Sequence, residues 1–432
     1  MHNLTSRRTL LAAAAGLTLT LTLAGQGIGQ DQVTLSFLVD NAPQTVSAAE
    51  KLVADFEAAN PDIKLDLETR PGGGEGDNIV KTRLATEDMT DVFLYNAGSL
   101  FQAINPTQNL VDLSAEPFMA NVLDSFKTVV TADGKQYGVP IQTAMGGGIL
   151  YNKPIYAELG LTVPKSWAEF EANNEKIKAA GKVPVIQTFK DTWTSQLFVL
   201  GDFYNVQVAE PDFAERYTKN EAKYATSDAA KKGFERQEEI FKAGYLNPDF
   251  GSATFNDGMR MIATGEGAHY PMLTFAIGGI AENNPDNLKD VGFFAIPGDD
   301  AAKNGLTVWM PPGLYIPKST EHLEQAKRFL AFVASTAGCD SQTAAVGATG
   351  PYLIKDCTLP ADVPPAVADL LPYFLEGGKT APALEFLSPI KGPSLEQITV
   401  EVGSGIRSAA DGAALYDEDV KKQAQQLGLA GW

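Results

Sequence analysis

Apolar and polar positions in the first part of the chain follow patterns that predict strands and helices in turn. Residues 33–39 are apolar and β-branched, and residues 63–67 alternate, as expected of strands. Apolar residues between them recur at helical spacing, and this helix should end at Asn60 because the residue before Pro61 avoids helical angles. A glycine-rich loop over 72–77, a helix over 78–86 and a strand over 91–95 follow. This order predicts an α/β fold with a parallel sheet.

The same alternation recurs later in the chain. Strands are expected over 183–186 and 291–296, and helices over 229–241 and 323–334. A length of 432 residues is typical of two or three domains. Two α/β bodies of similar size are therefore the economical interpretation.

The first thirty residues differ from the rest. They contain no acidic residue, and an uncharged stretch over 9–29 follows Arg7 and Arg8. A positive start, an apolar middle and a small-residue end predict an export signal over residues 1–30, cleaved near Gly29. The order Ser-Arg-Arg-Thr-Leu-Leu over 6–11 resembles a twin-arginine signal. A general secretory signal and an uncleaved membrane helix are the alternatives.

The amino-acid composition of the chain argues against several classes of partner and site. The chain has 53 acidic and 34 basic residues, a formal charge of −19, which argues against nucleic acid and anionic membranes as partners. Two cysteines and three histidines leave little for a zinc site, so neither a metal nor a cofactor is expected. In an exported protein, Cys339 and Cys357 are expected to form a disulfide that stabilises the fold by about 3 kcal/mol. Two buried thiols are the alternative.

Several segments resemble one known family. They are Gly-Lys-Gln-Tyr-Gly-Val-Pro at 134–140, Ile-Leu-Tyr-Asn-Lys at 149–153 and Val-Pro-Lys-Ser-Trp-Ala-Glu-Phe at 163–170. Residues 56–64, 91–93, 110–114 and 326–332 agree in order with further family segments, and 265–270 agree loosely. Together they resemble the extracellular solute-binding proteins of ABC sugar importers, the maltose-binding-protein-like family, over essentially all of residues 33–430. Ser166 stands where the family usually has threonine.

The resemblance implies a two-lobe fold of the periplasmic-binding-protein type, with a ligand cleft between the lobes. It places the N-lobe at 31–140 and 301–338, the C-lobe at 145–295 and 343–432, and hinge crossovers at 141–144, 296–300 and 339–342. The implied function is capture of a sugar and its delivery to an ABC import permease, without chemistry. We expect an exported monomer, located in the periplasm or at the cell surface.

Candidate ligand-binding residues combine aromatic rings, which stack on sugar faces, with polar groups that hydrogen-bond to hydroxyls. The family contacts ligand where the first strand ends, and Asn96 and Ser99 occupy the equivalent place after the third strand. Later loops at 350–351 and 385–386 are further, weaker candidates, whereas Trp167 is expected to pack in the core. The candidates are Asp40, Asn41, Glu75, Asp77, Asn96, Ser99, Gln142, Trp193, Tyr270 and Trp309.

Two other functions stay open. A secreted carbohydrate-active enzyme would use two carboxylates, and the chain has many acid pairs. The other is binding of a different solute, such as a polyamine or an osmolyte, which the excess of acidic residues would suit.

Overall fold

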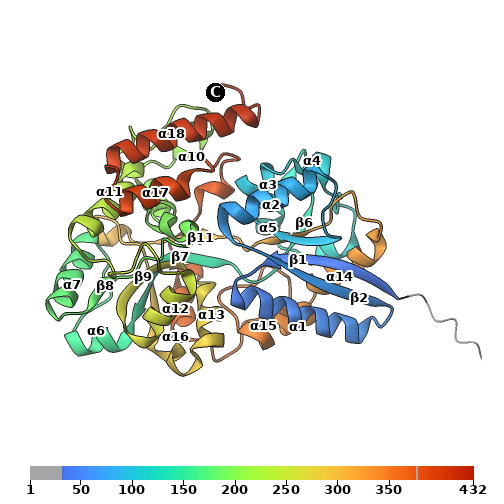
Figure 1. Cartoon of the computed structure of the whole chain (residues 1–432), viewed down its shortest axis with the longest axis horizontal. Helices are drawn as coiled ribbons and strands as arrows, with labels where there is room; N and C mark the ends of the chain where they lie inside the picture. The colour runs from blue at the N-terminus through green and yellow to red at the C-terminus, as the bar shows by residue number, and fades with distance from the viewer. Residues whose placement is uncertain (1–31, 376–377) are drawn as a thin grey trace, which may run out of the picture.

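The computed structural model describes residues 32–375 and 378–432. The predicted export signal lies outside these residues. No helix in the described ranges combines the length and the apolarity needed to cross a bilayer. The chain forms two lobes, each built on its own sheet, so the α/β fold and the two-body interpretation are confirmed (Figure 1).

The first lobe contains a five-stranded sheet in the order β2-β1-β3-β12-β6. Strand β1 is parallel to β2 and β3, whereas β12 is antiparallel to both of its neighbours. Because Asp40 pairs with Arg70 at the last position of β1 and β2, their side chains emerge at the same edge of the sheet. The strands are β1 Val33–Asp40, β2 Ile63–Arg70, β3 Val92–Tyr95, β6 Gly138–Pro140 and β12 Gly313–Tyr315, with a separate hairpin of β4 Thr131–Ala132 and β5 Lys135–Gln136.

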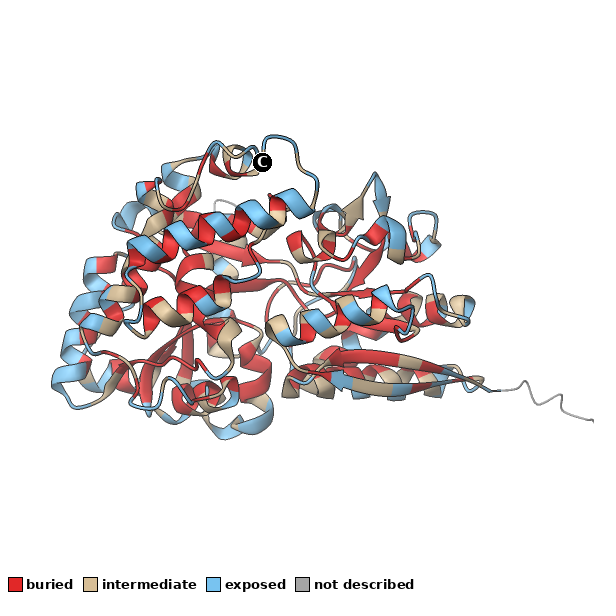
Figure 2. Cartoon of the chain, turned by 45° about the horizontal axis from the view of Figure 1, so that its top comes forward, coloured by how far each residue is buried: buried red, intermediate tan, exposed pale blue. Residues whose placement is uncertain are grey.

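Helices cover this sheet and bury their apolar sides against it, as the red inner and blue outer faces in Figure 2 show. Helix α1 begins at Pro43 and ends before Asn60, in agreement with the sequence. The helices of this lobe are α1 Pro43–Ala59, α2 Gly73–Ala85, α3 Ser99–Gln102, α4 Pro106–Asn109, η1 Pro117–Ala120, α5 Asp124–Val129, α14 Leu323–Val333 and α15 Thr336–Val346. Cys339 in α15 forms a disulfide with Cys357.

The second lobe contains a six-stranded sheet in the order β13-β11-β7-β9-β8, with β10 also pairing with β7. Strand β7 is buried along its whole length because helices cover both faces of the sheet. The strands are β7 Met145–Asn152, β8 Val183–Val185, β9 Gly267–Leu273, β10 Val291–Ala295, β11 Leu306–Trp309 and β13 Thr380–Pro382.

Two groups of helices surround the second sheet. One group of helices packs against β9 and β10 in one hydrophobic core. The other group, which includes α11 and α18, forms a separate hydrophobic core. The helices are α6 Lys153–Leu159, α7 Trp167–Ala179, η2 Thr192–Gln196, α8 Leu197–Leu200, α9 Phe203–Ala209, α10 Phe213–Thr218, α11 Asp228–Lys242, α12 Phe255–Thr264, α13 Ala276–Asn283, η3 Pro285–Asp290, η4 Ala301–Lys303, α16 Pro365–Leu370, η5 Leu371–Phe374, η6 Leu384–Phe386, α17 Leu395–Gly403 and α18 Ala409–Gln426.

The chain crosses between the lobes three times. The first crossing, over 141–144, connects β6 to β7. The second was expected at 296–300, but β10 and β11 share the second sheet, so the crossing lies at 310–312, between β11 and β12. The third was expected at 339–342, but these residues belong to α15, and residues 352–354 still pack in the first core. This crossing therefore follows residue 359 and precedes α16, which packs in the second core.

One helix boundary also differs from the prediction. Residues 73–77 were expected to form part of a loop, but they form the first turn of α2. Glycine disfavours helix, and that preference is weak enough for tertiary contacts to override it.

Candidate ligand-binding site

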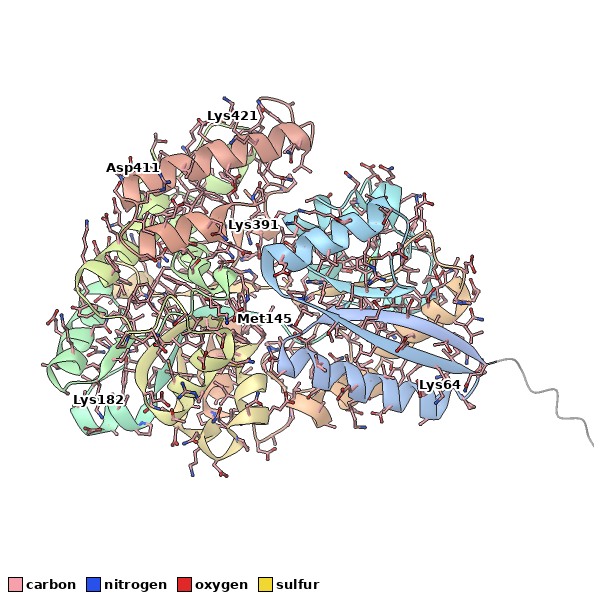
Figure 3. All side chains as sticks on the ribbon, viewed as in Figure 1. Lys64, Met145, Lys182, Lys391, Asp411 and Lys421 are labelled. Atoms are coloured by element: carbon pink, nitrogen blue, oxygen red, sulfur yellow. A yellow bond between two sulfur atoms is a disulfide. The ribbon has the colours of Figure 1, made fainter. Side chains whose placement is uncertain are left out.

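A cavity of about 600 Å³ lies between the two sheets and is lined by both lobes. The first lobe contributes the residues that follow the carboxyl ends of β1, β2 and β3, which is where α/β sheets bind ligands. The second lobe contributes η2, the end of β11 and the segment 385–396. Met145 and Lys391 mark this boundary region in Figure 3.

Charged groups dominate the wall formed by the first lobe. Asp40 accepts a hydrogen bond from the Ala42 amide at 3.0 Å, and burial raises the pKa of Asp40 against the lowering effects of that amide and of Arg70. Burial likewise raises the pKa of Asp77, opposed by Arg70, Lys81 and Lys391. Both carboxyl groups are thus held in a partly dry environment beside a cation.

Arg70 is the cation common to both carboxylates. Its side chain donates to the Pro71 carbonyl at 2.9 Å and the Leu94 carbonyl at 3.3 Å, and lies 5.9 Å from the centre of the Tyr95 ring. Its Nε atom is buried and has no hydrogen-bond partner among the described residues. A Cβ atom on Gly76 would lie 2.3 Å from Arg70 Nη1, so a glycine is needed for the guanidinium to fit.

An aromatic cluster forms part of the opposite wall. Trp193 lies in η2 and packs against Phe255 and Phe275, with ring centres 5.1 and 5.9 Å apart. Hydrogen bonds fix the turn on both sides of this ring. Thr192 Oγ1 donates to Glu396 at 2.8 Å, and Thr194 Oγ1 donates to the Thr188 carbonyl at 2.8 Å.

Trp309 is more enclosed than Trp193. It ends β11, is 5% exposed, and its ring lies against the backbone of Gly147, where a Cβ atom would be 2.1 Å away. Its indole Nε1 donates to Glu385 Oε1.

Lys391 supplies a nearly buried cation in the same wall. Its Nζ atom lies 3.3 Å from Glu385 Oε2. Burial alone would lower the pKa of Lys391, but Glu385, Glu396 and Asp77 outweigh it and raise that pKa. The lysine therefore stays charged at neutral pH.

The structure brings most of the predicted site residues together. Residues lining the cavity are Asp40, Asn41, Glu75, Asp77, Asn96, Gln142, Trp193 and Trp309. Glu385 and Phe386 line it as well, whereas 350–351 do not. Neither His269 nor His322 lines it, and residues 32–375 and 378–432 contain no cluster of three His, Cys, Asp or Glu that could hold a metal ion.

Two predicted residues lie elsewhere. Tyr270 is fully buried, and its hydroxyl is 2.9 Å from Thr188 Oγ1, so it supports the turn before Trp193 rather than facing the cavity. Ser99 is 3% exposed at the start of α3 and does not line the cavity either. The prediction of ligand contact is therefore corrected for both: strand β9 is buried on both faces, and Ser99 is buried although Asn96 and Ala97 before it line the cavity.

Residues 42–338 match the family described as bacterial extracellular solute-binding protein, which covers more than half of the chain. The chain belongs to this family.

Relatives of this solute-binding protein agree with that assignment. It is 26% identical over 310 residues to a multiple sugar-binding protein of Streptococcus mutans, covering 70% of this chain and 71% of the relative. A solved chitin oligosaccharide binding protein superposes with a TM-score of 0.79 at 21% identity, covering 91% of this chain and all of the other.

Two solved structures of proteins named RafE also share this fold. The solute-binding protein RafE in complex with raffinose gives a TM-score of 0.75, at 21% identity and with 92% of this chain and all of the other covered. The apo form of RafE from Streptococcus pneumoniae gives a TM-score of 0.65 at 22% identity, with 92% of this chain and 98% of the other covered.

Sequence reasoning missed several polar residues of this solute-binding protein that line the cavity, among them Arg70, Gln196, Lys391 and Glu396. Arg70 ends the second strand, so the rule that selected Asp40 at the end of the first strand could have found it. Lys391 and Glu396 follow the weaker candidate loop at 385–386, but no local pattern marks either residue.

Proposed function

We propose that this solute-binding protein captures a neutral sugar in the cavity between its lobes and delivers it unchanged to an ABC import permease. The observation that carries the proposal is the pairing of the half-buried indole of Trp193 in one wall of the cavity with carboxylate, amide and guanidinium groups on the opposite wall. A sugar presents an apolar ring face and a rim of hydroxyls, which this arrangement complements.

The charge around the cavity supports an uncharged ligand. Six carboxylates and four cations line it, so most of the charge is balanced by groups of the protein itself. The carboxylates are Asp40, Glu75, Asp77, Asp191, Glu385 and Glu396, and the cations are Arg70, Lys81, Lys190 and Lys391. A volume of about 600 Å³ falls within the range of small-molecule sites, roughly 300–1,000 Å³.

Buried polar atoms without protein partners support hydroxyl recognition. Gln196 Oε1 and Arg70 Nε have no hydrogen-bond partner among the described residues, and both residues line the cavity. Sites of this kind discriminate sharply, because an analogue without the matching hydroxyl leaves a buried group unpaired.

Two measurements on the freshly purified mature protein test the proposal. Native mass spectrometry identifies ligand retained through purification, and titration calorimetry compares neutral mono- and oligosaccharides with polyamines and betaines. We expect a neutral saccharide to bind and to be recovered intact. Binding of a polyamine or betaine alone would refute the sugar, and release of new reducing ends would refute capture without chemistry.

The remaining proposals concern the cell. Residues 1–30 direct export, the mature chain is a monomer, and the hinges are 141–144, 310–312 and the connection before α16. Substituting Arg7 and Arg8 by lysine tests the twin-arginine route, which predicts loss of export. Unchanged export would indicate the general secretory route.

A further inference from the structure

The glycine run at the start of α2 lies against the opposite lobe. A Cβ atom on Gly73 would lie 3.1 Å from Trp193 Cδ1 and 3.3 Å from Glu396 Oε2. On Gly72 it would lie 3.7 Å from Trp193 Nε1, and on Gly74 3.7 Å from Glu396 Oε2. Bare backbone of the first lobe therefore meets two side chains of the second.

Glu396 links this contact to the aromatic wall. Its Oε2 atom accepts the hydrogen bond from Thr192, the residue before Trp193. The same oxygen faces the first turn of α2, whose N-cap, Gly72, provides no side-chain hydrogen bond. A carboxylate is favourable beside the amino-terminal end of a helix. Glu396 thus holds the turn that carries Trp193 and complements the charge of a helix in the other lobe.

A second glycine turn of the first lobe also places its backbone against the second lobe. Gly98, between β3 and α3, has a φ of 71°, and a Cβ atom there would lie 2.3 Å from the Glu385 carbonyl oxygen and 2.8 Å from Phe386 Cδ1. The first lobe therefore presents backbone without side chains at two of its strand–helix turns, both next to the cavity and both touching the second lobe.

We propose that Gly72–Gly74 and Glu396 form a closure latch, a contact between the two lobes that holds them shut and slows release of the ligand. Glu396 is its positioning residue, since it acts through Thr192 and α2. The slowed release of ligand rests on the proposed function, because it requires that a sugar binds. The contact between Gly72–Gly74 and Glu396 can be tested without any sugar.

Cross-linking tests the contact without a ligand. Gly74→Cys with Glu396→Cys, treated with a short bis-methanethiosulfonate, should give an intramolecular cross-link visible by mass. Gly74→Cys with Glu418→Cys, whose second position is exposed on α18, is the matched pair and should give none. Cross-linking of both pairs, or of neither, would overturn the latch whether or not a sugar binds.

Kinetics with the saccharide bound in calorimetry test the function of the latch. Glu396→Gln should raise the dissociation rate by about two- to thirty-fold and leave the association rate unchanged, because closure follows encounter. Gly74→Leu should abolish the ligand-induced decrease in radius of gyration measured by X-ray scattering. Glu418→Gln and Thr82→Leu, at exposed positions of α18 and α2, are the controls.

The two readouts separate a latch from a direct ligand contact. Faster dissociation of Glu396→Gln with normal compaction of Gly74→Leu would assign Glu396 to the ligand alone and overturn the latch. Wild-type dissociation rates in both variants would overturn it as well. Absence of any bound saccharide would refute the proposed function, and the cross-linking result would still decide the contact.

Discussion

The indole of Trp309 donates to one carboxylate oxygen of Glu385, and the other oxygen lies 3.3 Å from Lys391 Nζ. One side chain thus holds both an aromatic ring and a nearly buried cation of the cavity wall. Since Glu385 and Lys391 are 13% and 15% exposed, little solvent screens their interaction.

This pair predicts a coupled effect on stability. Glu385→Gln keeps an acceptor for Trp309 but leaves Lys391 without its nearest carboxylate, so we expect the free energy of unfolding to fall by about 1–3 kcal/mol. Denaturant unfolding of Glu385→Gln, Lys391→Met and the double variant measures the coupling. Additive effects in this cycle would show that the two side chains do not depend on each other.

Removal of the Trp193 ring should weaken ligand binding. Trp193→Ala is expected to cost roughly 1.5–3 kcal/mol, because a large aromatic surface no longer covers the ligand. Calorimetry with the identified saccharide measures this loss. Trp432→Ala, at a ring that packs on Tyr217 away from the cavity, serves as the control. Wild-type affinity in Trp193→Ala would place the ring in packing alone.

Asp40 offers a test of charge at the opposite wall. Asp40→Asn preserves the shape but removes the charge, and hydrogen bonds to charged groups are worth about 1.5–3 kcal/mol, so affinity should fall by that amount. Asp66→Asn, at an exposed position of the same sheet, should bind normally. Equal affinities for the two variants would remove Asp40 from the site.

His269 predicts a dependence of stability on pH. It is fully buried between the Tyr156 hydroxyl at 2.6 Å and Asn174 Oδ1 at 2.9 Å, and burial lowers its pKa to about 3. The unfolded chain, with an ordinary histidine pKa of about 6.5, binds the extra proton between these values. The contribution of neutral His269 to the free energy of unfolding is therefore complete above about pH 6.5. Below this pH the free energy of unfolding falls by up to about 1.4 kcal/mol per pH unit.

Denaturant unfolding between pH 5 and 7 measures this slope, and His269→Gln should reduce it. An unchanged slope in His269→Gln would show that other groups cause the acid sensitivity. His322, which is half-buried just before α14, provides the control substitution His322→Gln.

The sequence predicted the elements whose periodicity is strong and whose neighbours are local. Helix α14 and strand β2 were found because one face of each is apolar, and strand β1 was found because it is a continuous apolar run. The polar residues that end β1 were placed at the cavity because α/β sheets bind ligands at the carboxyl ends of their strands. These inferences need only the chain's local pattern and the general behaviour of parallel sheets.

The failures concern contacts between distant segments. Strand β11 has only four residues and is followed by Pro311 and Pro312, so no strand was predicted there and the second crossing was misplaced. The first turn of α2, over Gly73–Gly76, was expected to be a loop because its three glycines give no helical pattern, and its neighbours Trp193 and Glu396 lie far along the chain. Tyr270 was expected at the site because β9, buried on both faces, has no alternation to show which side chains point inward.

The position of β12 has a consequence for synthesis. This strand, at 313–315, lies between β3 and β6 in the first sheet, so that sheet stays split until more than three hundred residues have left the ribosome. The amino-terminal lobe is thus unable to complete its sheet co-translationally ahead of the second lobe. Truncated chains ending before residue 313 should remain protease-sensitive throughout, and the two halves of this molecule mature together rather than in sequence.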